Sequence, residues 1–150
     1  SGGQLIRPVV VSKITRQDNQ IVKEFKIDLI AKGLFKKSDI DLVKTGLSLV
    51  PKDNGTAWPF FGFTIPSAGK TGTAETGETG KTQAWYTAFA PVDDPKITVT
   101  VLLEKGGEGS NVSAPIVKNI FTWFFSPDKN HLSNFEKYPI ASDSAKILGE

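Results

Sequence analysis

The sequence predicts an α+β fold in which an antiparallel sheet is flanked by helices. Three neighbouring segments in the second half are typical of strands, and short turns join them. The last of the three alternates Ile97, Val99, Val101 and Leu103 against Thr98, Thr100 and Leu102. Two other segments place apolar residues at helical spacing, one before these strands and one after them. With 150 residues, the chain suits one domain that can bury a core.

The first predicted element is a strand hairpin. Residues 8–16 are rich in β-branched side chains. Residues 20–27 alternate Ile21, Lys23, Phe25 and Ile27 against Val22, Glu24 and Lys26. Between them lies the turn sequence Gln-Asp-Asn-Gln at 17–20. The short connection predicts that the two strands pair with each other.

A helix is predicted next, over residues 38–50. We expect Ser38 and Asp41 to form a capping box at its start. Pro51 and the Asp-Asn-Gly sequence at 53–55 end it. Its apolar face consists of Ile40, Val43, Leu47 and Val50.

The sheet is predicted to be a three-stranded antiparallel meander, because its connections are short. We expect Trp85 and Phe89, on one face of the middle strand, to pack under a final helix that Ser113 caps and Pro127 ends. The strands are predicted at 70–75, 83–90 and 96–104. An aromatic connector precedes them at 58–66, a polar loop lies at 76–80, and a flexible loop lies at 106–109.

Composition narrows the classes of function. Eighteen basic and 16 acidic residues leave a net charge of +2, which gives no reason to expect a nucleic-acid partner. The chain has no cysteine and a single histidine, His131, so we expect no metal site and no cofactor. No apolar run reaches the roughly 18 residues of a membrane span.

The sequence AGKTGTAETG, residues 68–77, contains the most informative motif. A phosphate-binding loop would need a glycine five positions before Gly69, where Thr64 stands, and a helix after the motif. Neither condition holds. The segment instead predicts a strand edge with a cation at Lys70, hydroxyl groups beside it, and a main chain left open at Gly72. Taken alone, the same tripeptide also fits a solvated hairpin shoulder.

The neighbouring segments favour the strand-edge interpretation. AGKTGTAE followed by AWYTAFAP resembles the substrate strand and the next strand of the penicillin-binding proteins, whose signatures include Lys-Thr-Gly. The segments SGGQLIRPVVV, GTA at 55–57 and SAPIVKNIF are similar to other parts of that family, in the family's order. The resemblance spans residues 1 to about 125 and is closest to the class B, monofunctional enzymes.

The resemblance implies a role for each residue of the strand in a peptidoglycan D,D-transpeptidase. Lys70 would shape the electrostatics around the nucleophile and the substrate carboxylate, and the Thr71 and Thr73 hydroxyls would contact that carboxylate. Gly72 would let the substrate approach, and the Thr73 backbone N–H would form half of the oxyanion hole. The implied ligands are a D-Ala-D-Ala stem peptide and the β-lactams that mimic it. The implied location is the periplasmic or extracytoplasmic face of the bacterial inner membrane, with the anchor outside this chain.

The chain also departs from the family pattern. The nucleophile motif S-x-x-K is matched in letters only at residues 126–129, after the last helix, which we interpret as chance. No Ser-x-Asn stands in the family position either. We therefore expect residues 1–127 to be the C-terminal part of a transpeptidase domain, residues 128–150 to be a tail, and the chain alone to be inactive.

A further expectation follows from the missing segments. The strand at 96–104 would normally pair with N-terminal strands of the domain, so its free edge predicts a homodimer or aggregation. Two alternatives stay open at the level of sequence. One is a non-catalytic binding or assembly domain on the same fold, and the other is a D,D-carboxypeptidase or β-lactamase-like hydrolase.

Overall fold

The computed structural model describes residues 2–126 and divides into two compact units, residues 1–47 and the chain from residue 48 onward. Each unit is described by itself. The expected tail at 128–150 and the helix-ending role of Pro127 lie outside the described residues.

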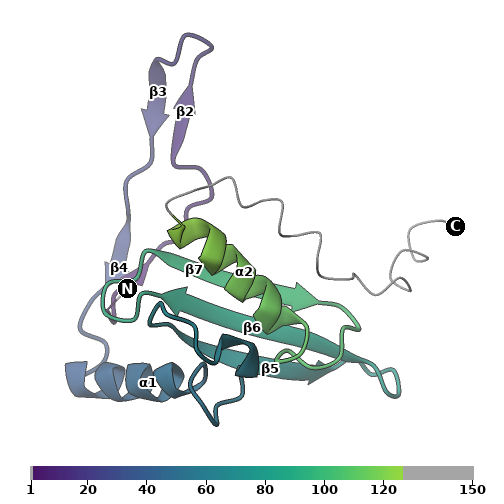
Figure 1. Cartoon of the computed structure of the whole chain (residues 1–150). Coiled ribbons are helices and arrows are strands. Elements are labelled where there is room, and N and C mark those ends of the chain that lie inside the picture. The colour runs from purple at the N-terminus through teal and green to yellow at the C-terminus, as the bar shows by residue number, and fades with distance from the viewer. Residues whose placement is uncertain (1, 127–150) are drawn as a thin grey trace, which may run out of the picture. The chain divides into compact units, whose positions relative to one another are not determined.

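The first unit contains the predicted hairpin, with shorter strands than the sequence indicates. Strands β2 (Lys13–Thr15) and β3 (Ile21–Glu24) pair antiparallel around a turn in which Asn19 has a left-handed φ of 64°. A second antiparallel pair, β1 (Leu5–Ile6) with β4 (Leu29–Ala31), was not predicted. It brackets the hairpin in the chain (Figure 1).

Helix α1 (Lys37–Leu49) begins in the first unit and confirms the predicted helix, but the capping box is wrong. The Ser38 hydroxyl donates to the Asp39 carboxylate at 3.3 Å. The Asp41 carboxylate accepts from Lys37 at 2.5 Å instead of turning back to a backbone N–H. The short aspartate and a competing lysine four residues earlier explain the difference.

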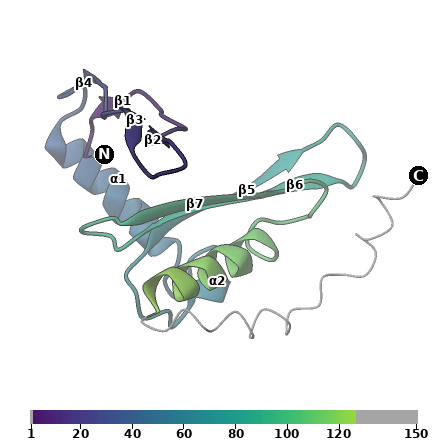
Figure 2. The same cartoon turned by 90° about the horizontal axis from the view of Figure 1, so that it is seen from above.

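The second unit contains the predicted meander. Strands β5 (Ala68–Glu75), β6 (Thr82–Ala90) and β7 (Ile97–Leu103) form an antiparallel sheet in the order β5-β6-β7. Helix α2 (Ser113–Phe125) lies across one face of this sheet (Figures 1 and 2). A short 3₁₀ turn, η1 (Trp58–Phe60), precedes the sheet and contacts α2.

The core lies between the sheet and α2. Phe60 packs against Tyr86 and Phe121, with ring centroids 5.5 and 6.1 Å away, and all three side chains are buried. The prediction that Trp85 and Phe89 pack under α2 is wrong, because they lie on the other face of β6 and Trp85 is 37% exposed. The small residues of β6 let the helix approach closely, and the buried ones are Ala84, Ala88 and Ala90.

Ser113 does not cap α2, which corrects a second helix-start prediction. Its buried hydroxyl donates to the Ala84 carbonyl at 2.9 Å and so ties the helix to β6. The first N–H groups of the helix, those of Ser113 and Ala114, donate to the Gly109 carbonyl instead. The turn before the helix therefore takes over the capping role.

Candidate functional site

The Lys-Thr-Gly motif lies on an edge strand, as the sequence predicts. Strand β5 pairs with β6 along its whole length, and no described strand pairs with its other side. Its residues 68–75 are extended, and the exposed positions are Lys70 and the segment from Thr73 to Glu75. An open strand edge of this kind can accept an extended peptide through main-chain hydrogen bonds.

The register of the sheet places the predicted site residues on two faces. Thr71 is opposite Tyr86 and Thr73 is opposite Ala84, so both hydroxyls lie on the face that α2 covers. Lys70 is opposite Thr87 and lies on the other face. The structure thus brings the two hydroxyls together and separates the ammonium group from them. Only a ligand along the strand edge has access to both faces.

Each side chain of the motif has a defined surrounding. The Lys70 ammonium donates to the Thr71 carbonyl oxygen at 2.6 Å and is otherwise open to solvent. The Thr71 hydroxyl lies 2.8 Å from the hydroxyl of Thr56, fifteen residues earlier. At Gly72 a Cβ atom would lie 3.3 Å from the Trp85 Cβ, so a side chain there would crowd the strand pair.

The loop before α2 lies directly against the motif strand. A Cβ atom on Gly109 would come within 2.0 Å of the Trp85 carbonyl oxygen and 2.6 Å of the Gly72 carbonyl oxygen. Asn111 accepts a hydrogen bond from the Trp58 indole at 3.1 Å. The loop predicted as flexible is therefore fixed at this point, and only glycine fits where it crosses β5 and β6.

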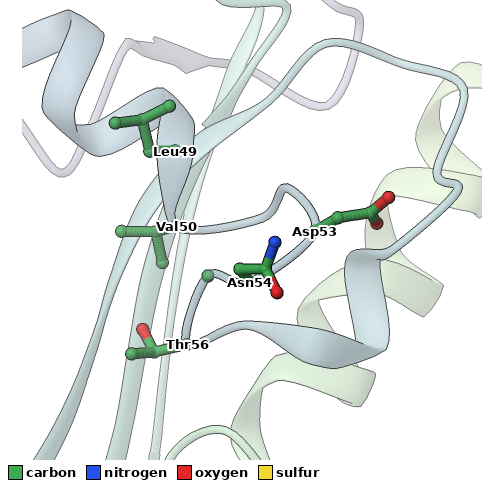
Figure 3. A pocket seen from close by; sticks show the side chains of 6 residues that line it. Leu49, Val50, Asp53, Asn54 and Thr56 are labelled. Atoms are coloured by element: carbon green, nitrogen blue, oxygen red, sulfur yellow. The ribbon is translucent and has the colours of Figure 1, made fainter.

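A pocket of about 360 Å³ adjoins the motif strand through Thr56. It is lined by the end of α1 and the following turn, with Leu49, Val50 and Thr56 side by side in Figure 3. Asn54 adopts a left-handed φ of 70° in this turn. Gly55 approaches the Leu49 and Val50 carbonyl oxygens so closely that an added Cβ would lie 2.3 and 2.2 Å from them.

Charged side chains cluster at the turn between β5 and β6 rather than at the Lys-Thr-Gly motif. The Glu78 carboxylate lies 2.8 Å from the Lys81 ammonium and 2.7 Å from that of Lys105. Hydrogen bonds from Lys105 and Lys81 lower the pKa of Glu78 to about 2, and the same carboxylate raises the pKa of Lys105. On the core side, burial raises the pKa of the Tyr86 hydroxyl.

Two absences hold for the part of the chain that the structure describes. Within residues 2–126, no group of three or more histidine, cysteine, aspartate or glutamate side chains could hold a metal ion. Over the same residues, no helix is long and apolar enough to span a membrane.

Comparison with known proteins agrees with this geometry. Residues 1–122 match the penicillin-binding protein transpeptidase domain. Peptidoglycan D,D-transpeptidase MrdA of Haemophilus influenzae is 37% identical over 67 residues, 45% of this chain. Peptidoglycan D,D-transpeptidase PbpA of Mycolicibacterium smegmatis is 49% identical over 60 residues, 35% of this chain. The solved imipenem acyl-enzyme of penicillin-binding protein A from M. tuberculosis superposes with a TM-score of 0.66 at 27% identity, covering 83% of this chain.

These findings define the class of protein as bacterial cell-wall transpeptidase domains with an antiparallel sheet and flanking helices. The chain belongs to the penicillin-binding protein transpeptidase domain family. It spans 10% and 12% of the lengths of the two curated relatives and 28% of the solved chain.

Proposed function

We propose that this chain is the substrate-binding and β-lactam-binding portion of a class B peptidoglycan D,D-transpeptidase, which cross-links stem peptides through an acyl-serine intermediate. The rest of the transpeptidase domain would supply the serine nucleophile. The observation that carries the proposal is the position of Lys-Thr-Gly on an edge strand whose outer side pairs with no described strand. An extended D-Ala-D-Ala peptide, or a β-lactam that mimics it, would lie along this edge.

The main chain of β5 supports an oxyanion role for Thr73. In an antiparallel strand, the N–H and C=O of one residue point to the same side, and alternate residues share that side. The Thr71 carbonyl accepts a hydrogen bond from the Lys70 ammonium at 2.6 Å. We infer that Thr71 and Thr73 direct their main-chain groups to the free side, where the Thr73 N–H would stabilise a developing oxyanion.

The side chains would divide the remaining work. The Thr71 and Thr73 hydroxyls would bind the substrate carboxylate. Gly72, on the Lys70 face, would let the substrate backbone approach the strand closely. Lys70, on the face opposite the two hydroxyls, would hold the electrostatics around the nucleophile that the rest of the transpeptidase domain supplies. Removing one oxyanion donor costs about 3–4 kcal/mol of transition-state stabilisation in well-studied hydrolases. The Thr73 N–H would contribute transition-state stabilisation of that size.

The wider setting follows from the same proposal. Residues 1–127 would be the C-terminal part of the transpeptidase domain, with residues 128–150 as a tail. The protein would work at the periplasmic or extracytoplasmic face of the bacterial inner membrane, where peptidoglycan is made. Its partners would be the stem peptide and the remainder of the transpeptidase domain.

A homodimer through β7 is a further part of the proposal. Among the described strands β7 pairs only with β6, and its sequence ITVTVLL contains no charge and no proline to protect the free edge. The isolated chain would therefore pair with a second copy. We expect a concentration-dependent dimer by light scattering, and substitution of the exposed Thr98 by lysine should shift it to monomer. A monomer at all concentrations would contradict this part.

Labelling with a fluorescent penicillin tests the main proposal. The complete transpeptidase, with this chain and the serine nucleophile together, should form one covalent adduct, detected by mass spectrometry. The 150-residue chain alone should form none, because it would lack the acylated serine. Lys70→Ala in the complete protein should reduce labelling strongly, whereas Lys96→Ala, in the turn before β7, should not. A stoichiometric adduct on the isolated chain would overturn the assignment.

A further inference from the structure

We propose that Thr56 is a positioning residue for the bound carboxylate: its hydroxyl donates a hydrogen bond to Thr71 and thereby keeps the single Thr71 proton for the ligand. This inference rests on the proposed function of the motif strand. It concerns a residue on the turn after α1, fifteen positions from Thr71 in sequence.

The numbers of donors and acceptors on the Thr56 and Thr71 hydroxyls determine which of them donates when a carboxylate is bound. The two oxygen atoms lie 2.8 Å apart, and either hydroxyl can be the donor in the absence of a ligand. A threonine hydroxyl has one proton and two lone pairs, whereas an ionised carboxylate can only accept. When Thr71 donates to a carboxylate, it has no proton left for Thr56. The bond persists only with Thr56 as donor, and it then orients the Thr71 hydroxyl toward the ligand.

The backbone around Thr56 holds it in place for this role. The Ala57 N–H donates to the Val50 carbonyl at 2.9 Å, and the Gly55 N–H donates to the Lys52 carbonyl at 2.7 Å. The absence of a side chain at Gly55 lets the turn close on the end of α1. Thr56 then lies on the wall of the pocket in Figure 3, with its hydroxyl at the motif strand.

Burial argues against a purely structural bond. Thr56 is exposed and Thr71 is half-buried, so water could satisfy both hydroxyls if the pair were separated. A hydrogen bond between accessible hydroxyls adds little to folding. The Thr56–Thr71 hydrogen bond would instead contribute to ligand binding, because it would orient the Thr71 hydroxyl toward the carboxylate. The chain offers a matched comparison in the Thr87 and Thr100 hydroxyls, 3.0 Å apart between β6 and β7.

The test uses the complete transpeptidase that contains this chain and its nucleophile. Stopped-flow acylation by benzylpenicillin separates the non-covalent dissociation constant from the acylation rate, and benzylpenicillin methyl ester removes the ionised carboxylate. Thr56→Val, which keeps the shape of the side chain, should weaken non-covalent binding about three- to tenfold. Thr56→Ser should restore it. The loss should vanish with the ester, and Thr100→Val should behave like the unsubstituted protein.

Two further measurements complete the test: one on the double variant Thr56→Val with Thr71→Val, and one on the unsubstituted transpeptidase, which is the reference protein. Thr56→Val should cost nothing further when Thr71 is already valine, because the two hydroxyls act as a unit. Additive losses, or equal losses for the acid and its ester, would overturn the positioning role. Unchanged binding in Thr56→Val, with a loss in Thr71→Val, would overturn it and leave the proposed function standing. A reference protein that penicillin does not acylate would overturn both.

Discussion

Substitution of Gly69 by alanine should lower the free energy of unfolding, because the added methyl group would crowd the packing of β5 on β6. Gly69 is buried on the α2 face of β5, immediately before Lys70. An added Cβ would lie 2.7 Å from the Thr87 carbonyl oxygen, 2.8 Å from the Tyr86 hydroxyl oxygen and 2.9 Å from the Ala88 Cβ. Two of these three atoms are fixed in the paired strand β6, so β5 has to move away from it.

The size of the effect follows from the kind of atoms involved. Overpacking a well-packed interior by one methyl group typically costs 1–3 kcal/mol. The contacts with a backbone oxygen and a Cβ atom place Gly69→Ala near the upper end, at about 2–3 kcal/mol. Removing the Tyr86 hydroxyl relieves the third contact. Gly69→Ala combined with Tyr86→Phe should therefore cost less than the sum of the two single changes.

Urea unfolding followed by tryptophan fluorescence gives the free energies for this cycle. Gly46→Ala is the matched control, since no atom lies within 4 Å of a Cβ added at Gly46, in the interior of α1. The control should be stabilising by about 0.5–1 kcal/mol, because alanine favours a helix more than glycine does. If Gly69→Ala leaves the unfolding midpoint unchanged, the close packing of β5 on β6 at this position is wrong.

Three other perturbations test the packing and the electrostatics. Tyr86→Phe should be neutral or stabilising by up to about 1 kcal/mol in thermal unfolding, because the buried hydroxyl has no partner among the described residues; a clear loss would indicate one. Ser113→Ala should cost about 1 kcal/mol by the same measurement, because it leaves the buried Ala84 carbonyl without its hydroxyl donor, whereas an unchanged midpoint would argue against this bond. The pKa of Glu78 is lowered from 4.5 to about 2, so its stabilising contribution should be present above pH 4.5 and lost as the pH falls toward 2. Glu78→Gln should flatten that acid limb of the unfolding curve at low salt, and high salt should mimic the substitution because the group is exposed.

The sequence predicts the meander well because local signals determine it. Strands β5, β6 and β7 are short runs of strand-forming residues joined by short turns, and both features are properties of neighbouring positions. The same signals fail to tell which face of β6 is buried. Apolar residues occupy both faces of that strand, and by size alone Trp85 and Phe89 are the better core candidates. The buried face instead carries Tyr86 between alanines, since α2 needs small residues to pack closely on the sheet.

The candidate site was predictable only in part, for a related reason. The motif consists of four consecutive residues, Lys70, Thr71, Gly72 and Thr73, and such a motif can be recognised in a single sequence. The contacts that shape this strand join distant positions. Thr56 meets Thr71 across fifteen residues, and Gly109 meets the Gly72 carbonyl from a loop after β7. Neither contact has a periodicity or spacing by which one sequence could reveal it.

The side chains of the motif lie on two faces of the sheet, and this division limits which ligands can contact all of them. Within residues 48–126, α2 covers the face of the two threonine hydroxyls, while Lys70 lies on the opposite face. That opposite face also carries Trp85 and Leu102, which are 37% and 38% exposed. A ligand that needs a cation and hydroxyl donors together is thus confined to the line where the faces meet. Main-chain groups already occur there at strand spacing, so we expect the edge to favour an extended backbone with a terminal carboxylate over a compact anion.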